Sequence, residues 1–95
     1  YDKALEIDPK DAYTLRNKGL ALVNLGKHEG AIIQFDKALG IDPNDALVLD
    51  SKAKSLFELK KFSEAKSILD KVSQANPNDN EVKELLDKIN KELSK

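Results

Sequence analysis

Hydrophobic residues recur at intervals of three to four along most of the chain. Between residues 12 and 25, for example, Leu15, Leu22 and Leu25 fall on one side of a helix, with small Gly19 among them. No segment alternates hydrophobic and polar residues in the way a half-buried strand does. The pattern therefore predicts an all-α protein, with helices expected at 12–25, 31–41, 46–59, 62–75 and 80–95.

Short turns separate these helices. Gly26-Lys27 interrupts the first hydrophobic stripe and is typical of a helix C-terminus, and Lys60-Lys61 occupies the same place later in the chain. Pro43 lacks a backbone donor, so it ends the second helix. Each pair of helices is therefore expected to form an antiparallel hairpin.

The hairpins repeat with a period of 34 residues, which indicates an array of stacked units. Three prolines mark this period, and an aspartate two residues after each proline is expected to cap the next helix. The prolines are Pro9, Pro43 and Pro77, and the aspartates are Asp11, Asp45 and Asp79.

The period divides the chain into the tail of an earlier repeat (1–11), two whole repeats (12–45 and 46–79) and a final capping helix (80–95). Tyr1–Ile7 matches the end of a second helix whose partner is missing, so we expect the chain to be a piece of a longer protein. Exposed apolar surface at this end predicts a possible homodimer through the truncated N-terminus.

Small residues recur where the paired helices are expected to cross. Gly19 and Ala53 share one position of the repeat, and Ala31 and Ala65 share another. A larger side chain there would hold the two backbones apart. Gly19 costs a helix about 0.8–1 kcal/mol relative to alanine, which close packing would offset.

The chain resembles the tetratricopeptide repeat family, and the similarity covers nearly all of it. The pentatricopeptide repeats, which bind RNA, have a similar unit but usually lack the proline. The matching positions in the first repeat are Leu15, Gly19, Leu22, Ala31, Phe35, Ala38 and Pro43, and those in the second are Leu49, Ala53, Leu56, Ala65, Leu69, Val72 and Pro77.

The resemblance implies a right-handed α-solenoid that binds a partner protein or peptide on its concave face. In that family the first helix of each pair lines this face. Leu20 and Phe57 have an alternative role, because they can instead pack against the neighbouring first helix. The implied groove residues are Tyr13, Arg16, Asn17, Leu20, Val23 and Asn24, followed by Leu47, Asp50, Ser51, Lys54, Phe57 and Glu58.

Some members of the family clamp the C-terminal carboxylate of a chaperone tail with lysine and asparagine side chains. Arg16 can stand for one such lysine. The asparagine positions hold Leu20 and Ser51, however, and the last basic positions hold Glu81 and Leu85. The resemblance therefore implies a groove without this clamp.

Composition excludes several other functions. The net charge is −1 and lysines are mixed with carboxylates, so no basic stripe marks a nucleic-acid surface. No apolar run is long enough to cross a membrane and no signal-like start is present, so a cytoplasmic location is expected. The chain contains no cysteine, which leaves no disulfide and no thiolate chemistry.

No residues converge as a catalytic, metal or cofactor site. His28 is the only histidine and shares its position with Phe62, so we expect it to pack at the helix turn. The preferred interpretation is a non-enzymatic interaction scaffold. The alternatives are a self-assembly module and a regulatory arm of a larger enzyme.

Overall fold

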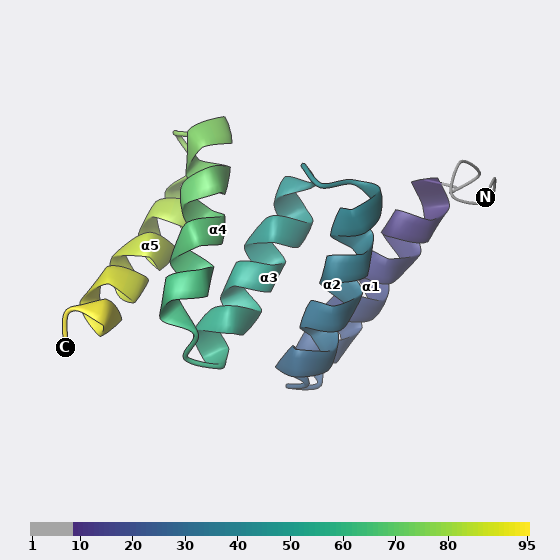
Figure 1. Cartoon of the computed structure of the whole chain (residues 1–95), viewed down its shortest axis with the longest axis horizontal. Coiled ribbons are helices and arrows are strands. Elements are labelled where there is room, and N and C mark those ends of the chain that lie inside the picture. The colour runs from purple at the N-terminus through teal and green to yellow at the C-terminus, as the bar shows by residue number, and fades with distance from the viewer. Residues whose placement is uncertain (1–8) are drawn as a thin grey trace.

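The computed structural model describes residues 9–95, which form five helices and no strand (Figure 1). This confirms the predicted all-α, solenoid-like fold. The helices are α1 (Pro9–Asn24), α2 (His28–Ile41), α3 (Ala46–Glu58), α4 (Phe62–Ala75) and α5 (Asn80–Leu93).

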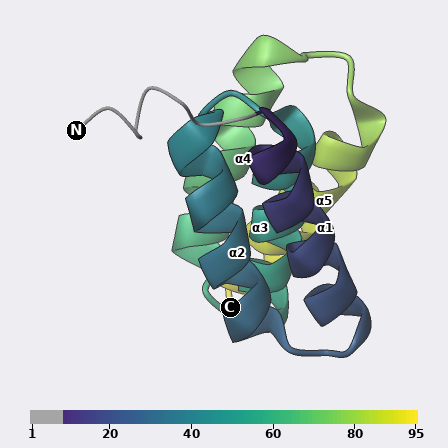
Figure 2. The same ribbon diagram turned by 90° about the vertical axis from the view of Figure 1, so that its right-hand side faces the viewer.

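The helices form two layers, with α1, α3 and α5 in one and α2 and α4 in the other. Figure 2 shows α1 and α5 on one side of the molecule and α2 and α4 on the other. Helix α1 contacts α3, and α3 contacts α5, whereas α2 and α4 make no such contact. The layer with the closer helices lies on the inside of the curve, so α1, α3 and α5 line the concave face.

Two of the three predicted aspartate caps are confirmed. Asp45 accepts hydrogen bonds from the backbone N–H groups at the start of α3, and Asp79 does the same at the start of α5. The prediction for Asp11 is wrong, because α1 begins two residues earlier and contains Asp11 in its first turn.

Both hairpin turns have the same backbone geometry although their sequences differ. Gly26 has a φ of 76° and Lys60 a φ of 63°. After α3, the Lys60 N–H donates to the Phe57 carbonyl at 2.9 Å and the Lys61 N–H donates to the Leu56 carbonyl at 2.8 Å. The equivalent pair of bonds closes the turn after α1. This is the Schellman motif, which requires a left-handed residue and favours glycine.

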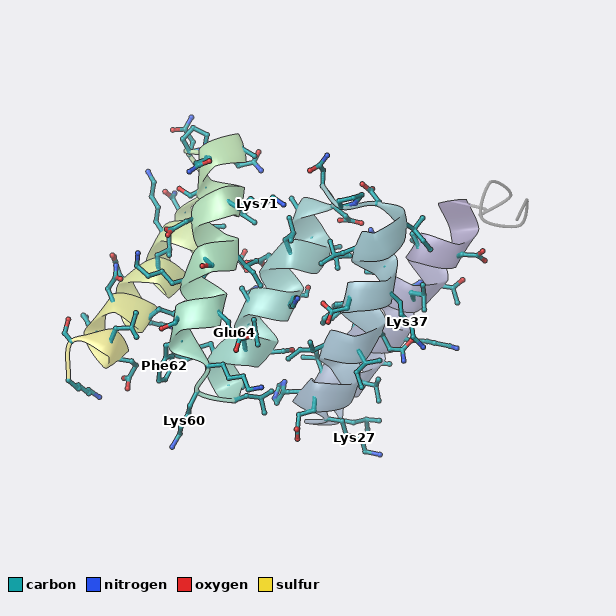
Figure 3. All side chains as sticks on the ribbon, in the orientation of Figure 1. Lys27, Lys37, Lys60, Phe62, Glu64 and Lys71 are labelled. Carbon is teal, nitrogen blue, oxygen red and sulfur yellow. The ribbon has the colours of Figure 1, made fainter. Side chains whose placement is uncertain are left out.

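We therefore expect Lys60→Gly to stabilise the protein. The left-handed conformation costs a side-chain-bearing residue about 1–2 kcal/mol, whereas the extra chain entropy of glycine costs about 0.5–1 kcal/mol. Lys60 projects from the turn between α3 and α4 (Figure 3), so its replacement removes no packing. The free energy of unfolding, measured in urea, should rise by about 0.5–1 kcal/mol. Gly26→Lys is the matched control and should lower it; a decrease for Lys60→Gly would refute the explanation.

The small residues lie at the helix crossings as predicted. Ala31, Ala53 and Ala65 are all fully buried. Gly19 meets the ring of Phe35 so closely that an added Cβ would lie 2.4 Å from its Cε1 atom. At the equivalent place in the second hairpin, alanine faces the smaller Leu69.

Buried side chains form two clusters, and Leu39 packs against both. One joins α1 and α2 with Val48 of α3, and the other joins α3, α4 and α5. One predicted core residue is misplaced: Leu25 is 69% exposed. It follows the last residue of α1 and therefore lies beyond the stripe that faces α2. Its counterpart Leu59 is partly buried.

Helix α5 covers the second hairpin with one apolar face. Val82, Leu85 and Ile89 are buried in the cluster that also holds α3 and α4 residues. In a complete repeat, the first helix packs against the second through positions such as Leu15, Gly19 and Leu22. On α5 the equivalent positions hold polar residues. These polar residues are Lys83, Asp87 and Asn90, all of which are exposed.

The predicted helix end at Tyr1–Ile7 lies outside the described residues, so the N-terminal self-association remains a prediction. Within residues 9–95, no helix is long and apolar enough to cross a membrane.

Candidate functional site

The predicted groove residues lie on α1 and α3, which contact each other on the concave face. Most of them are at least partly accessible. Tyr13 is 58% exposed, and Asn17 and Asn24 are also exposed. Ser51 is only 8% exposed, so it offers little surface to a ligand.

At the N-terminal end of this face, Arg16 lies over the Tyr13 ring, with its guanidinium carbon 4.8 Å from the ring centroid. Its Nη1 atom is 3.5 Å from the Asp45 carboxylate, at the long end of an ion pair. The other Asp45 oxygen caps α3. Helix α1 thus presents a stacked cation beside an exposed aromatic ring.

Further along the face, Lys54 bridges two carboxylates from different helices. Its ammonium lies 3.2 Å from Asp50, one turn earlier on α3, and pairs with Glu81 on α5. The hydrogen bond that Lys54 donates to Glu81, aided by Asp50, raises the pKa of Lys54, although burial opposes this shift. Because this pKa is raised on folding, the bridge contributes stability below about pH 10.4 and loses it as the lysine deprotonates at higher pH.

Leu20 and Phe57 are partly buried rather than fully available. Leu20 packs against the first core cluster and Phe57 against the second. The Phe57 ring also meets Phe62 edge-to-face, with centroids 5.4 Å apart. Each side chain therefore supports the scaffold and leaves only part of its surface for a ligand.

Sequence reasoning missed the ion-pair partners within this face. Asp45 was predicted only as a helix cap, and Glu81 was noted only because it occupies a basic position of the carboxylate clamp. The spacing of the partners gave a partial signal in the sequence, because Arg16 and Asp45 are 29 residues apart and Lys54 and Glu81 are 27 apart. Residues separated by a little less than one repeat are brought together when the units stack.

The described residues also line two clefts that lie outside the predicted groove. One of about 400 Å³ lies between the start of α3 and the end of α4, and its lining includes Leu49 and Val72. The other, of about 300 Å³, lies between α2, α3 and the start of α4 and includes Ile33.

His28 begins α2 and is partly buried, with Nδ1 3.5 Å from the Ser55 hydroxyl oxygen. This contact joins the first hairpin to α3 of the second. Among residues 9–95, no three histidine, aspartate or glutamate side chains cluster as a metal site would require.

Comparison with protein families identifies the repeat. A tetratricopeptide repeat profile matches residues 35–89, and a second profile of that description matches residues 1–33. The chain belongs to the tetratricopeptide repeat family. It is therefore a repeat of the kind used as a protein–protein interaction module. The comparison with curated proteins gives no significant match.

Solved tetratricopeptide repeat domains share the fold. The first such domain of Spaghetti (RPAP3), bound to the HSP90 peptide SRMEEVD, has a TM-score of 0.82 and 25% sequence identity, covering 93% of this chain and 72% of that one. The first such domain of human RPAP3, solved by NMR, has a TM-score of 0.57 and 24% identity over 92% of this chain and 95% of that one.

In this tetratricopeptide repeat chain, the positions implied for a carboxylate clamp carry little positive charge. Leu20 packs against the core, Ser51 is buried and Glu81 is paired with Lys54. Arg16 is the one basic side chain among them. The side chains that form the clamp in some family members are therefore mostly absent from these positions.

Proposed function

We propose that the chain binds an extended segment of a partner protein on the face formed by α1, α3 and α5. The observation that carries this proposal is the contact of α1 with α3 and of α3 with α5, which α2 and α4 do not share. We expect Tyr13 and Arg16 on α1 and Lys54 on α3 to form one binding strip. The HSP90 peptide bound to the related domain supports a peptide as the ligand.

The layer of α2 and α4 is a poorer candidate. Figure 3 views the molecule from this side, with Lys37 on α2 and Glu64 and Lys71 on α4. These helices do not contact each other, so their side chains form no continuous strip. Ile33 is the large apolar residue most exposed on α2.

Two matched substitutions distinguish these faces. Peptides selected against the intact chain by phage display would be measured by fluorescence anisotropy. Tyr13→Ala should weaken binding about tenfold or more, because exposed aromatic anchors often dominate such interfaces. Ile33→Ala is the control: it removes a side chain of similar exposure, 55% against 58%, from the other layer.

Unchanged affinity for Tyr13→Ala together with a loss for Ile33→Ala would assign binding to the outer layer and refute the proposal. The self-assembly alternative is tested on the same sample by sedimentation equilibrium. If the chain selects no peptide but associates with itself at micromolar concentration, the repeats act as an assembly module instead. Binding by a monomer supports a separate partner.

A further inference from the structure

Building on the proposed function, we infer that the concave face selects an internal peptide segment with one acidic and one basic side chain about three residues apart. It discriminates against a free C-terminal carboxylate. The inference deepens the proposed function by naming the chemistry of the partner. It rests on the charges along this face, on their incomplete pairing and on the spacing of the helices.

The charges on this face change sign from one repeat to the next. Arg16 and Asp50 are separated by one period of 34 residues, so they hold equivalent positions on α1 and α3. Beyond Asp50, Glu81 adds a second carboxylate from α5, and the two share the single ammonium of Lys54. The face therefore carries an excess of carboxylate between α3 and α5, whereas at α1 it presents the Arg16 guanidinium in a long ion pair with Asp45.

Neither Arg16 nor Asp50 is fully satisfied by its neighbours. Their side chains keep about a fifth of their surface, at 22% and 17% exposed. Within residues 9–95, the buried Nε of Arg16 and the buried Oδ1 of Asp50 have no hydrogen-bond partner. Leaving a buried polar atom without a hydrogen bond destabilises the structure. A ligand that draws either side chain into better pairing would recover part of this energy.

Helix spacing sets the separation of the two ligand charges. Packed helices lie about 8–10 Å apart, and an extended peptide advances about 3.3 Å per residue, so one repeat corresponds to about three residues. Leu20 on α1 and Leu47 on α3 supply apolar surface on these two helices. The expected segment therefore has an acidic residue facing Arg16, apolar residues next to it and a basic residue facing Asp50 and Glu81.

A C-terminal carboxylate fits this face poorly. A free carboxylate near Asp50 or Glu81 would meet like charge, which raises the cost of binding. Near Arg16 it would use one end of the face only and would leave Asp50 and Glu81 without a basic partner from the ligand. An internal segment avoids the first cost and uses both ends of the face.

The test compares four blocked six-residue peptides by fluorescence anisotropy, all acetylated and amidated so that they carry no terminal charge. Leucine pairs separate positions 2 and 5, which hold glutamate and lysine, two glutamates, two lysines or two glutamines. The peptide SRMEEVD with a free carboxylate is a fifth probe. The mixed-charge peptide should bind at least about tenfold tighter than every other probe, and the preference should weaken with added salt.

Two charge variants give the inference its own signature. Asp50→Arg should move the preference to the two-glutamate peptide, and Arg16→Glu should move it to the two-lysine peptide. Asp50→Asn removes the charge without reversing it and is used if Asp50→Arg disturbs folding. It should lower the affinity for the mixed-charge peptide about fivefold or more. Far-ultraviolet circular dichroism establishes that each variant is folded.

Tightest binding of SRMEEVD or of the two-glutamate peptide to the unchanged chain would overturn the inference and leave the proposed function standing. The same holds if no probe binds although phage-selected peptides do. If the phage-selected peptides also fail to bind, both the inference and the proposed function are refuted. A mixed-peptide preference that does not respond to Asp50→Asn would likewise overturn the assignment.

Discussion

Removal of residues 80–95 is expected to unfold or aggregate the second hairpin. Helix α5 buries Val82, Leu85 and Ile89 against α3 and α4. Each large apolar side chain contributes about 1.5–3 kcal/mol, so together they approach the entire stability of a small domain, which is about 5–15 kcal/mol. Sedimentation velocity and thermal melting of a chain ending at Asp79 measure the effect. A monomer with an unchanged melting temperature would contradict the capping role.

Matched alanine substitutions on α5 show whether the buried face is responsible. Ile89→Ala should lower the free energy of unfolding by about 2–5 kcal/mol, because that side chain is fully buried. Leu93→Ala, one turn later, is the control. Its side chain is 45% exposed, so the loss should be much smaller. Equal losses at the two positions would mean that α5 contributes through its helix formation alone.

Gly19→Ala is expected to destabilise the protein although alanine is the better helix former. Its Cβ would lie 2.4 Å from the Phe35 ring, and overpacking of this kind costs about 1–3 kcal/mol. Over most of this range, the cost of overpacking exceeds the gain in helix propensity from glycine to alanine, which is about 1 kcal/mol. Phe35→Leu should relieve the clash, because the second hairpin already combines Ala53 with Leu69 at these positions.

A double-mutant cycle in urea tests this compensation directly. Each single variant should be less stable than the parent, Gly19→Ala through the clash and Phe35→Leu through the cavity that it leaves. The double variant should recover stability, with a coupling energy of about 1–3 kcal/mol. Strictly additive losses would show that Gly19 and Phe35 do not share this space.

The 34-residue period was enough to predict the helical hairpins and the small residues at their crossings. These features repeat, so each unit supports the interpretation of the other.

The wrong predictions lie at positions where the first repeat differs in structure from the later ones. Asp11 was assigned a capping role because Asp45 and Asp79 have it, yet α1 begins at Pro9. Leu25 was placed in the core, although α1 ends just before it.

The pattern of ion pairs on the concave face was harder to predict than the helices. Periodicity places Lys54 on that face but does not choose between its possible partners on α3 and α5. Long side chains have many rotamers, and the choice depends on which groups the stacked neighbour presents. The bridge to both Asp50 and Glu81 therefore became visible only in three dimensions.

Backbone amide chemical-shift mapping of the intact chain with a selected peptide shows whether the layer of α1, α3 and α5 binds the partner. We expect perturbations concentrated at Asn17, Leu20 and Lys54 and weak elsewhere. Perturbations confined to α2 and α4, around Asp36 and Asp70, would contradict it.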